Sequence, residues 1–109
     1  MLKEKINLTE EGIEKLVALG ATRWSKYGKD RIYLKNIAKE LGLEFERYNT
    51  GNICSATFKG ETISNSKCGR MLGQMEKAFI DIATSEIVME GREDEGQLLI
   101  DSLKEILSK

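Results

Sequence analysis

Two loops in the middle of the chain are rich in amide and hydroxyl side chains, which donate and accept directional hydrogen bonds. The first loop covers residues 48–53, with the sequence YNTGNI, and the second covers residues 62–66, with the sequence TISNS. Each loop adjoins a short run of β-prone residues, and neither carries a group suited to breaking a covalent bond. This composition indicates ligand recognition rather than catalysis.

The chemistry of these loops suits an adenine nucleotide. An asparagine amide can pair with an adenine edge, and a helix N-terminus beside a cation favours a phosphate. The ligand-binding residues expected here are Tyr48, Asn49, Asn52, Asn65, Ser66 and Arg70. A second interpretation needs no ligand, because asparagine and glycine can satisfy a turn and serine can cap a helix. Gly51 and Gly60 belong to no phosphate-loop motif.

A predicted hairpin between residues 22 and 34 interleaves aromatic and basic side chains. An exposed ring can stack on a nucleobase, and an arginine can bind a phosphate through two hydrogen bonds. The ligand-binding residues expected on this hairpin are Trp24, Lys26, Arg31 and Tyr33. Alternatively, the hairpin is simply solvated and Trp24, the single tryptophan of the chain, is half-buried against the core.

The composition argues against an enzyme. The chain has no histidine, which is the commonest general base near neutral pH and a frequent metal ligand. Its aspartates are scattered, and the acidic run 93–95 is typical of a solvated linker. We therefore expect no catalytic residue, no metal site and no cofactor. We expect Cys54 and Cys68 to be reduced, structural residues.

Length and charge limit the architecture and the partners. The chain has 109 residues, 40% of them hydrophobic, which suffices for a single core. Seventeen basic and eighteen acidic residues give a net charge of -1, so any contact with a polyanion must be local. Because no apolar run approaches the roughly 18–20 residues of a membrane span, we expect a cytoplasmic protein without a membrane partner.

The periodicity predicts an α+β fold with a single domain over residues 1–109. In this fold, N-terminal, middle and C-terminal helices pack on an antiparallel sheet of five or six short strands. Residues 1–5 lead into the first helix, over residues 9–19, which Thr9 caps and Gly20 ends. Residues 28–30 are expected to form the hairpin turn, and residues 37–41 a short helix.

The second half of the chain is expected to begin with strands at residues 43–46 and 53–59, followed by a helix with a buried stripe. The stripe consists of Cys68, Met71, Leu72 and Met75. Residues 78–90 fit either an extension of this helix or two strands, and their β-branched content favours strands. Residues 91–96 predict a hinge before a C-terminal helix, which packs on its own domain or on a second copy.

Residues 24–33 and the segment from Tyr48 to Ser66 resemble small proteins of phages and mobile elements in low-GC bacteria. The likeness covers about residues 22–83. The chain is most similar to phage counter-defence proteins that act as nucleotide sponges against Thoeris-type immunity. This resemblance implies a homo-oligomer in the host cytoplasm that binds a cyclic ADP-ribose-type signal without cleaving it. It transfers no individual binding residue to this chain.

Two other functions remain open from the sequence. The chain could bind a host defence protein directly, as anti-CRISPR inhibitors do, with Trp24, Tyr27 and Tyr33 as anchors. A nucleic-acid mimic would be strongly acidic, and this chain is nearly neutral. It could also be a small RNA-binding domain. That function requires a basic face, and the mixed charges along every predicted strand argue against one.

Overall fold

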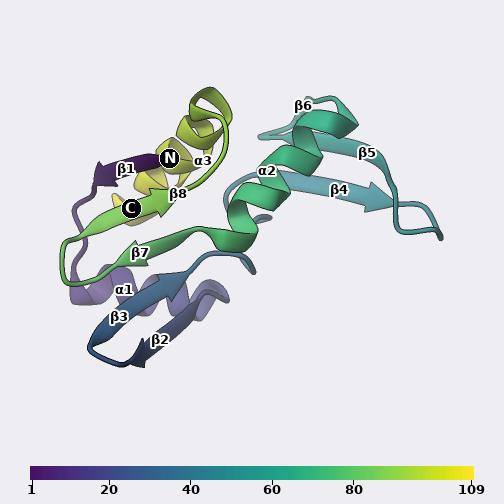
Figure 1. The fold of residues 1–109 in the computed structure, drawn as a ribbon. Coiled ribbons are helices and arrows are strands. Elements are labelled where there is room, and N and C mark those ends of the chain that lie inside the picture. Colours follow the sequence, from purple (N-terminus) through teal and green to yellow (C-terminus); the bar gives the residue numbers. More distant parts are fainter.

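A five-stranded antiparallel sheet forms the centre of the computed structural model, which describes all of residues 1–109. Its strand order is β1-β8-β7-β3-β2 (Figure 1). The strands are β1 (Leu2–Lys5), β2 (Thr22–Lys26), β3 (Lys29–Tyr33), β7 (Phe79–Asp81) and β8 (Glu86–Met89). Alternate residues of each strand point to opposite faces of the sheet, so the register decides which side chains meet.

Two helices, α1 (Glu10–Leu19) and α3 (Glu93–Leu107), cover one face of this sheet (Figure 1). On that face, Ile32, Ile80 and Ile87 are fully buried and form one row, because Ile80 pairs with both of the others. These side chains belong to a single core of 21 buried residues. The opposite face of the sheet carries no helix.

The two ends of α1 agree with the cap and the terminator predicted from the sequence. The Thr9 hydroxyl accepts a hydrogen bond from the Gly12 N–H at 3.0 Å, and Gly20, with a φ of 124°, ends α1. Ser64 caps the middle helix, α2 (Asn65–Lys77), through its hydroxyl. The predicted stripe of α2 is confirmed in its three fully buried members, which are Cys68, Met71 and Met75.

A second antiparallel sheet has three strands in the order β4-β5-β6. Its strands are β4 (Leu43–Arg47), β5 (Ile53–Phe58) and β6 (Glu61–Thr62). Helix α2 contacts β5 of this sheet as well as β8 and α3, so it joins the two sheets (Figure 1). The prediction of a single α+β domain with antiparallel strands and three helices is confirmed, with the strands divided between two sheets. No helix is long and apolar enough to cross a bilayer.

Residues 78–90 form the β7–β8 hairpin, as their composition favoured. Helix α2 stops because Ala78 adopts an extended conformation with ψ of 141°. Residues 2–5, by contrast, form the edge strand β1, where the sequence predicted only an approach to the first helix. β1 pairs with β8, a strand more than 80 residues away in the sequence, and no local sequence pattern predicts such a pairing.

The turn of the β2–β3 hairpin lies one residue earlier than predicted. Tyr27 and Gly28 both have positive φ, 54° and 75°, as a type I′ turn requires. This two-residue turn pairs Lys26 with Lys29, so Lys29 and Asp30 belong to β3 rather than to the turn. The pairing register of β2 with β3 depends on this turn.

The predicted short helix over residues 37–41 is wrong, because this segment forms only hydrogen-bonded turns. The Leu41 N–H reaches the carbonyls of both Ile37 and Ala38. A segment this short does not offset the cost of helix nucleation. Its Leu41 carbonyl instead accepts a 2.7 Å hydrogen bond from the buried Ser102 hydroxyl, which fixes the segment to α3.

The predicted solvated connector at residues 91–96 also needs correction. Helix α3 begins at Glu93, and both Glu95 and Gly96 are buried. A Cβ atom on Gly96 would lie 2.5 Å from Cδ1 of Leu2, so the glycine allows α3 to approach β1 closely. The acidic run is therefore the first turn of a packed helix, where carboxylates suit the positive end of the helix dipole.

Candidate functional site

The uncovered face of the five-stranded sheet, which we call the open face, is defined by strand register. One cross-strand row on it, the Phe79 row, contains Thr22, Tyr33, Phe79, Val88 and Lys3. The next row, the Arg31 row, contains Trp24, Arg31, Asp81, Glu86 and Lys5. Lys26 and Lys29 form a third, shorter row beside the hairpin turn. All these side chains are exposed or half-buried, whereas Ile32, Ile80, Ile87 and Met89 on the helix-covered face are buried.

The centre of the open face is a contact between a cation and two aromatic rings. The guanidinium carbon of Arg31 lies 4.1 Å from the centre of the Phe79 ring, and its Nη1 donates a 3.3 Å hydrogen bond to the Tyr33 hydroxyl. The Tyr33 and Phe79 rings lie 5.8 Å apart at 48°. These contacts hold the arginine fork and the rings in fixed positions on a rigid sheet.

The aromatic surface continues toward the hairpin tip. Trp24 is the register partner of Arg31, and its ring centre lies 6.4 Å from that of Tyr27. Tyr27 is 91% exposed at the turn. The structure therefore places Trp24, Lys26, Arg31 and Tyr33 on one surface, as the sequence predicted. The alternative interpretation, a solvated hairpin, also expected a half-buried Trp24. The structure agrees with that interpretation in the burial of Trp24 and in nothing else.

Strand alternation separates the charges that are mixed along the sequence. The open face carries five cations and two carboxylates, so its charge is five minus two, or three positive. The cations are Lys3, Lys5, Lys26, Lys29 and Arg31, and the carboxylates are Asp81 and Glu86. Mixed charges along the strands thus do not exclude a basic face, contrary to the inference from sequence.

The remaining charges of these strands lie on the helix-covered side. Arg23 and Asp30 form an ion pair there, with Nη2 and Oδ2 2.8 Å apart. The hydrogen bond from Arg23 lowers the pKa of the Asp30 carboxyl below its ordinary value. Glu4 pairs with Lys104 of α3. The lysines and Arg31 of the open face take no part in these pairs, so they are the cations available to an anionic ligand.

The amide-rich loops lie at the other end of the molecule, around the β4–β5 connection (Figure 1). Tyr48 and Asn52 close a turn, since the Tyr48 N–H donates to the Asn52 carbonyl at 2.7 Å. The Asn65 amide donates to the Ile53 carbonyl at 2.8 Å and so ties the start of α2 to β5. Asn49 and Ser66 are exposed. The structure does not bring this cluster to the hairpin, so the two predicted clusters form no common site.

Arg70, the last residue of the predicted loop site, is engaged with a buried carboxylate. Its Nε donates to both oxygens of Glu95 at 2.9 and 3.0 Å, and its Nη2 lies 2.7 Å from Oε1. These hydrogen bonds raise the pKa of Arg70. Glu95 is only 4% exposed, so its charge requires this partner. Arg70 therefore has a structural role between α2 and α3.

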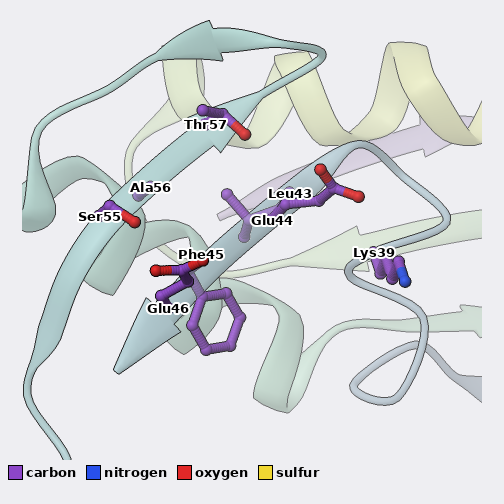
Figure 2. A pocket seen from close by; sticks show the side chains of 8 residues that line it. All are labelled: Lys39, Leu43, Glu44, Phe45, Glu46, Ser55, Ala56 and Thr57. Carbon is purple, nitrogen blue, oxygen red and sulfur yellow. The ribbon is translucent and has the colours of Figure 1, made fainter. Parts of the chain in front are cut away.

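A hollow of about 570 Å³ lies across β4 and β5 of the small sheet. Figure 2 shows its lining residues, which are Lys39, Leu43, Glu44, Phe45, Glu46, Ser55, Ala56 and Thr57. Glu44 pairs in register with Thr57 and Glu46 with Ser55, so carboxylates face hydroxyls across the strands. None of the residues predicted from the sequence lines this hollow. Its carboxylates repel a phosphate, which separates it chemically from the open face.

Several residues of the open face were not predicted as site residues, because they lie far in the sequence from the β2–β3 hairpin. Phe79, Asp81 and Glu86 belong to the β7–β8 hairpin, and Lys3 and Lys5 belong to β1. The signal that could have found the lysines is the alternation in Leu2–Lys5, where every second residue is basic. The contact between Phe79 and Arg31 depends on pairing of β3 with β7, which the sequence does not specify.

The chain shows no significant match to a known protein family, to a curated protein or to a solved structure. The assignment of a function therefore depends on the physical chemistry of the open face. That face offers rings for stacking and cations for charge neutralisation, and it presents both on a rigid sheet.

Proposed function

We propose that the protein is a non-enzymatic nucleotide-binding protein that holds its ligand on the open face. The observation that carries the proposal is the position of Arg31, stacked on Phe79 and bonded to Tyr33 at the centre of a basic surface. A nucleotide combines a flat base with an anionic phosphate. Rings and a fixed arginine fork complement both parts.

The expected binding mode follows from these contacts. A base stacks on the Tyr33 ring, which is tilted by 48° from the Phe79 ring that Arg31 covers, and its phosphate accepts hydrogen bonds from the outward edge of the Arg31 guanidinium. Stacking on an aromatic side chain contributes about 1–3 kcal/mol per base, and a charge-assisted hydrogen bond is stronger than a neutral one. The chain offers no histidine to act as a general base, so we expect the bound nucleotide to be released without cleavage.

A nucleotide sponge, which the resemblance implies, is one biological role for this activity. Sites for small molecules usually bury about 70–90% of the ligand. The open face is a sheet surface, so a sponge for a cyclic ADP-ribose-type signal requires a second copy to close over the ligand. The homo-oligomer expected from the sequence supplies such a copy.

Fluorescence of Trp24, the single tryptophan, tests the proposal directly because the residue lies on the open face. We expect AMP, UMP and cyclic ADP-ribose to change this emission at about millimolar concentration or below. Arg31→Ala should weaken the change for each ligand. Arg47→Ala is the matched control, since Arg47 also lies over a ring, that of Phe45 on the other sheet, at 4.9 Å.

Two results would contradict the proposal. One is an unchanged Trp24 signal with all three nucleotides. The other is an equal loss of affinity in Arg31→Ala and Arg47→Ala, which would show that the arginines act through stability or overall charge. Chromatography of the recovered ligand tests the absence of cleavage, because steady conversion by the pure protein would reveal an enzyme.

A further inference from the structure

The open face extends well beyond the Arg31 cluster, and its far edge is also basic. Lys3 and Lys5 lie on β1, three strands away from β3, which carries Arg31. At about 4.8 Å per strand, this separation is roughly 14 Å. A mononucleotide whose phosphate binds Arg31 has no second phosphate for these lysines.

We infer that the open face binds a single-stranded nucleic acid laid across its five strands. This inference rests on the proposed function, because it uses the same stacking and phosphate contacts and repeats them along a polymer. Cations occupy both edges of the face, with Lys26 and Lys29 near the hairpin turn and Lys3 and Lys5 on β1. Successive phosphates of one strand can reach both edges.

The Phe79 row provides the path for the bases. Tyr33 and Phe79 are adjacent in this row, Val88 continues its apolar surface, and Lys3 ends it. The row contains no carboxylate. A strand can therefore place a base on the Tyr33 ring beside the Arg31–Phe79 contact and a phosphate at Lys3 without meeting a carboxylate of this row.

The Arg31 row limits where the phosphates of a bound nucleic-acid strand can lie. Asp81 and Glu86 are register partners in the middle of this row, between Arg31 and Lys5. Two carboxylates side by side repel phosphates from this part of the face. Oδ1 of Asp81 already accepts a 3.1 Å hydrogen bond from the Ala83 N–H, and its Oδ2 and the oxygens of Glu86 can accept hydrogen bonds from base amino groups. The row therefore favours phosphates at its ends and base edges at its centre.

The aromatic contacts require unpaired bases. In a duplex the faces of the bases are stacked on each other, so no base offers a free face to the Tyr33 ring. A single strand exposes those faces, and its stacking on side chains tolerates every base. We therefore expect a preference for single strands over duplexes and little dependence on sequence.

Fluorescence anisotropy with labelled octamers of U and of dT tests the inference, beside an eight-base-pair duplex and UMP as a competitor. We expect each octamer to bind at least ten times more tightly than UMP or the duplex. Binding should weaken as salt rises, because phosphate contacts release counterions at a slope of about −0.7 per contact for single strands.

The decisive variant is Lys3→Ala/Lys5→Ala, with Lys15→Ala/Lys109→Ala as its control. The control removes the same charge on the side of α1, where Lys15 donates to the Lys109 carbonyl. We expect the first variant to lose at least fivefold in octamer affinity, to lower the salt slope by about 1.4, and to keep its affinity for UMP. The control should match the unmodified protein.

The outcomes separate the two proposals. Equal affinity for octamer, duplex and UMP, or equal behaviour of the two double variants, would overturn the single-strand inference and leave mononucleotide binding intact. Absence of any Trp24 response to nucleotides and octamers would overturn both. Binding that is tight for the octamers and insensitive to salt and to Lys3→Ala/Lys5→Ala would also overturn the inference, since it would place the polymer elsewhere.

Discussion

The guanidinium of Arg31 is stacked on the Phe79 ring, with 4.1 Å between its carbon and the ring centre. The two residues come from β3 and β7, which are separated by α2 and the entire small sheet along the chain. This contact therefore exists only in the folded protein. It fixes the arginine in the absence of a ligand, which would lower the entropic cost of the proposed nucleotide binding.

Replacing the Phe79 ring should weaken ligand binding more than it weakens the fold. In Phe79→Leu we expect about 0.5–2 kcal/mol less binding energy for a nucleotide, because the cation–π contact that positions the Arg31 guanidinium is lost. The half-buried site keeps an apolar side chain, so the melting temperature should fall by only a few degrees. Val88→Ala, in the same row, is the control. Equal affinity losses in the two variants would contradict the role of the ring.

The hydrogen bond between Ser102 and the Leu41 carbonyl should contribute measurably to stability. Ser102→Ala leaves that carbonyl without its partner in a buried position, which costs about 1–3 kcal/mol. Denaturant unfolding measures the loss as a lower midpoint with an unchanged slope. Ser108→Ala, which removes an exposed hydroxyl bonded to Glu105, should have almost no effect. A similar midpoint for both variants would show that the buried bond is dispensable.

The start of α3 should behave as packed structure and not as a hinge. Gly96→Ala places a Cβ 2.5 Å from Leu2 Cδ1 and 3.3 Å from Met89 Sδ, so these side chains must move; such overpacking costs about 1–3 kcal/mol, against a gain of about 1 kcal/mol from the helix propensity of alanine. Gly73→Ala in α2 meets no atom within 4 Å, so the better helix propensity of alanine should leave stability unchanged or raise it. Thermal melts compare the two. An unchanged melting temperature for Gly96→Ala would support the flexible connector that the sequence predicted.

Local patterns were sufficient to predict the parts of the fold that depend on nearby residues. Thr9 identifies a helix start because a cap acts within three residues. The hairpin residues Trp24 and Arg31 were placed on one surface for the same reason. Strand β1 and the ring of Phe79 were missed because their positions depend on pairing between distant segments, which carries no local signal. The open face is the product of both kinds of contact.

The two cysteines should differ sharply in reactivity. Cys68 is fully buried, and burial raises the pKa of its thiol, so the reactive thiolate is scarce and shielded. Cys54 is half-buried and free. We expect iodoacetamide at pH 8 to modify Cys54 in the folded protein and to modify Cys68 only after denaturation. Peptide mass spectrometry reports both sites, and equal labelling of the folded protein would contradict the buried position of Cys68.

The ion pair between Arg23 and Asp30 should make a small contribution to stability that depends on pH. Because the hydrogen bond from Arg23 lowers the pKa of Asp30 in the folded protein, the contribution is present above the unfolded value of about 3.9. It disappears as the pH falls through the lower, folded value. Asp30→Asn should therefore melt below the unmodified protein at pH 7, and the difference in melting temperature should shrink as the pH falls below about 3.9. Asp101→Asn, which removes a carboxylate that accepts a hydrogen bond from Gln97, is the control. A gap for Asp30→Asn that stays constant from pH 7 to pH 2 would show that its cause is not the charge of the pair.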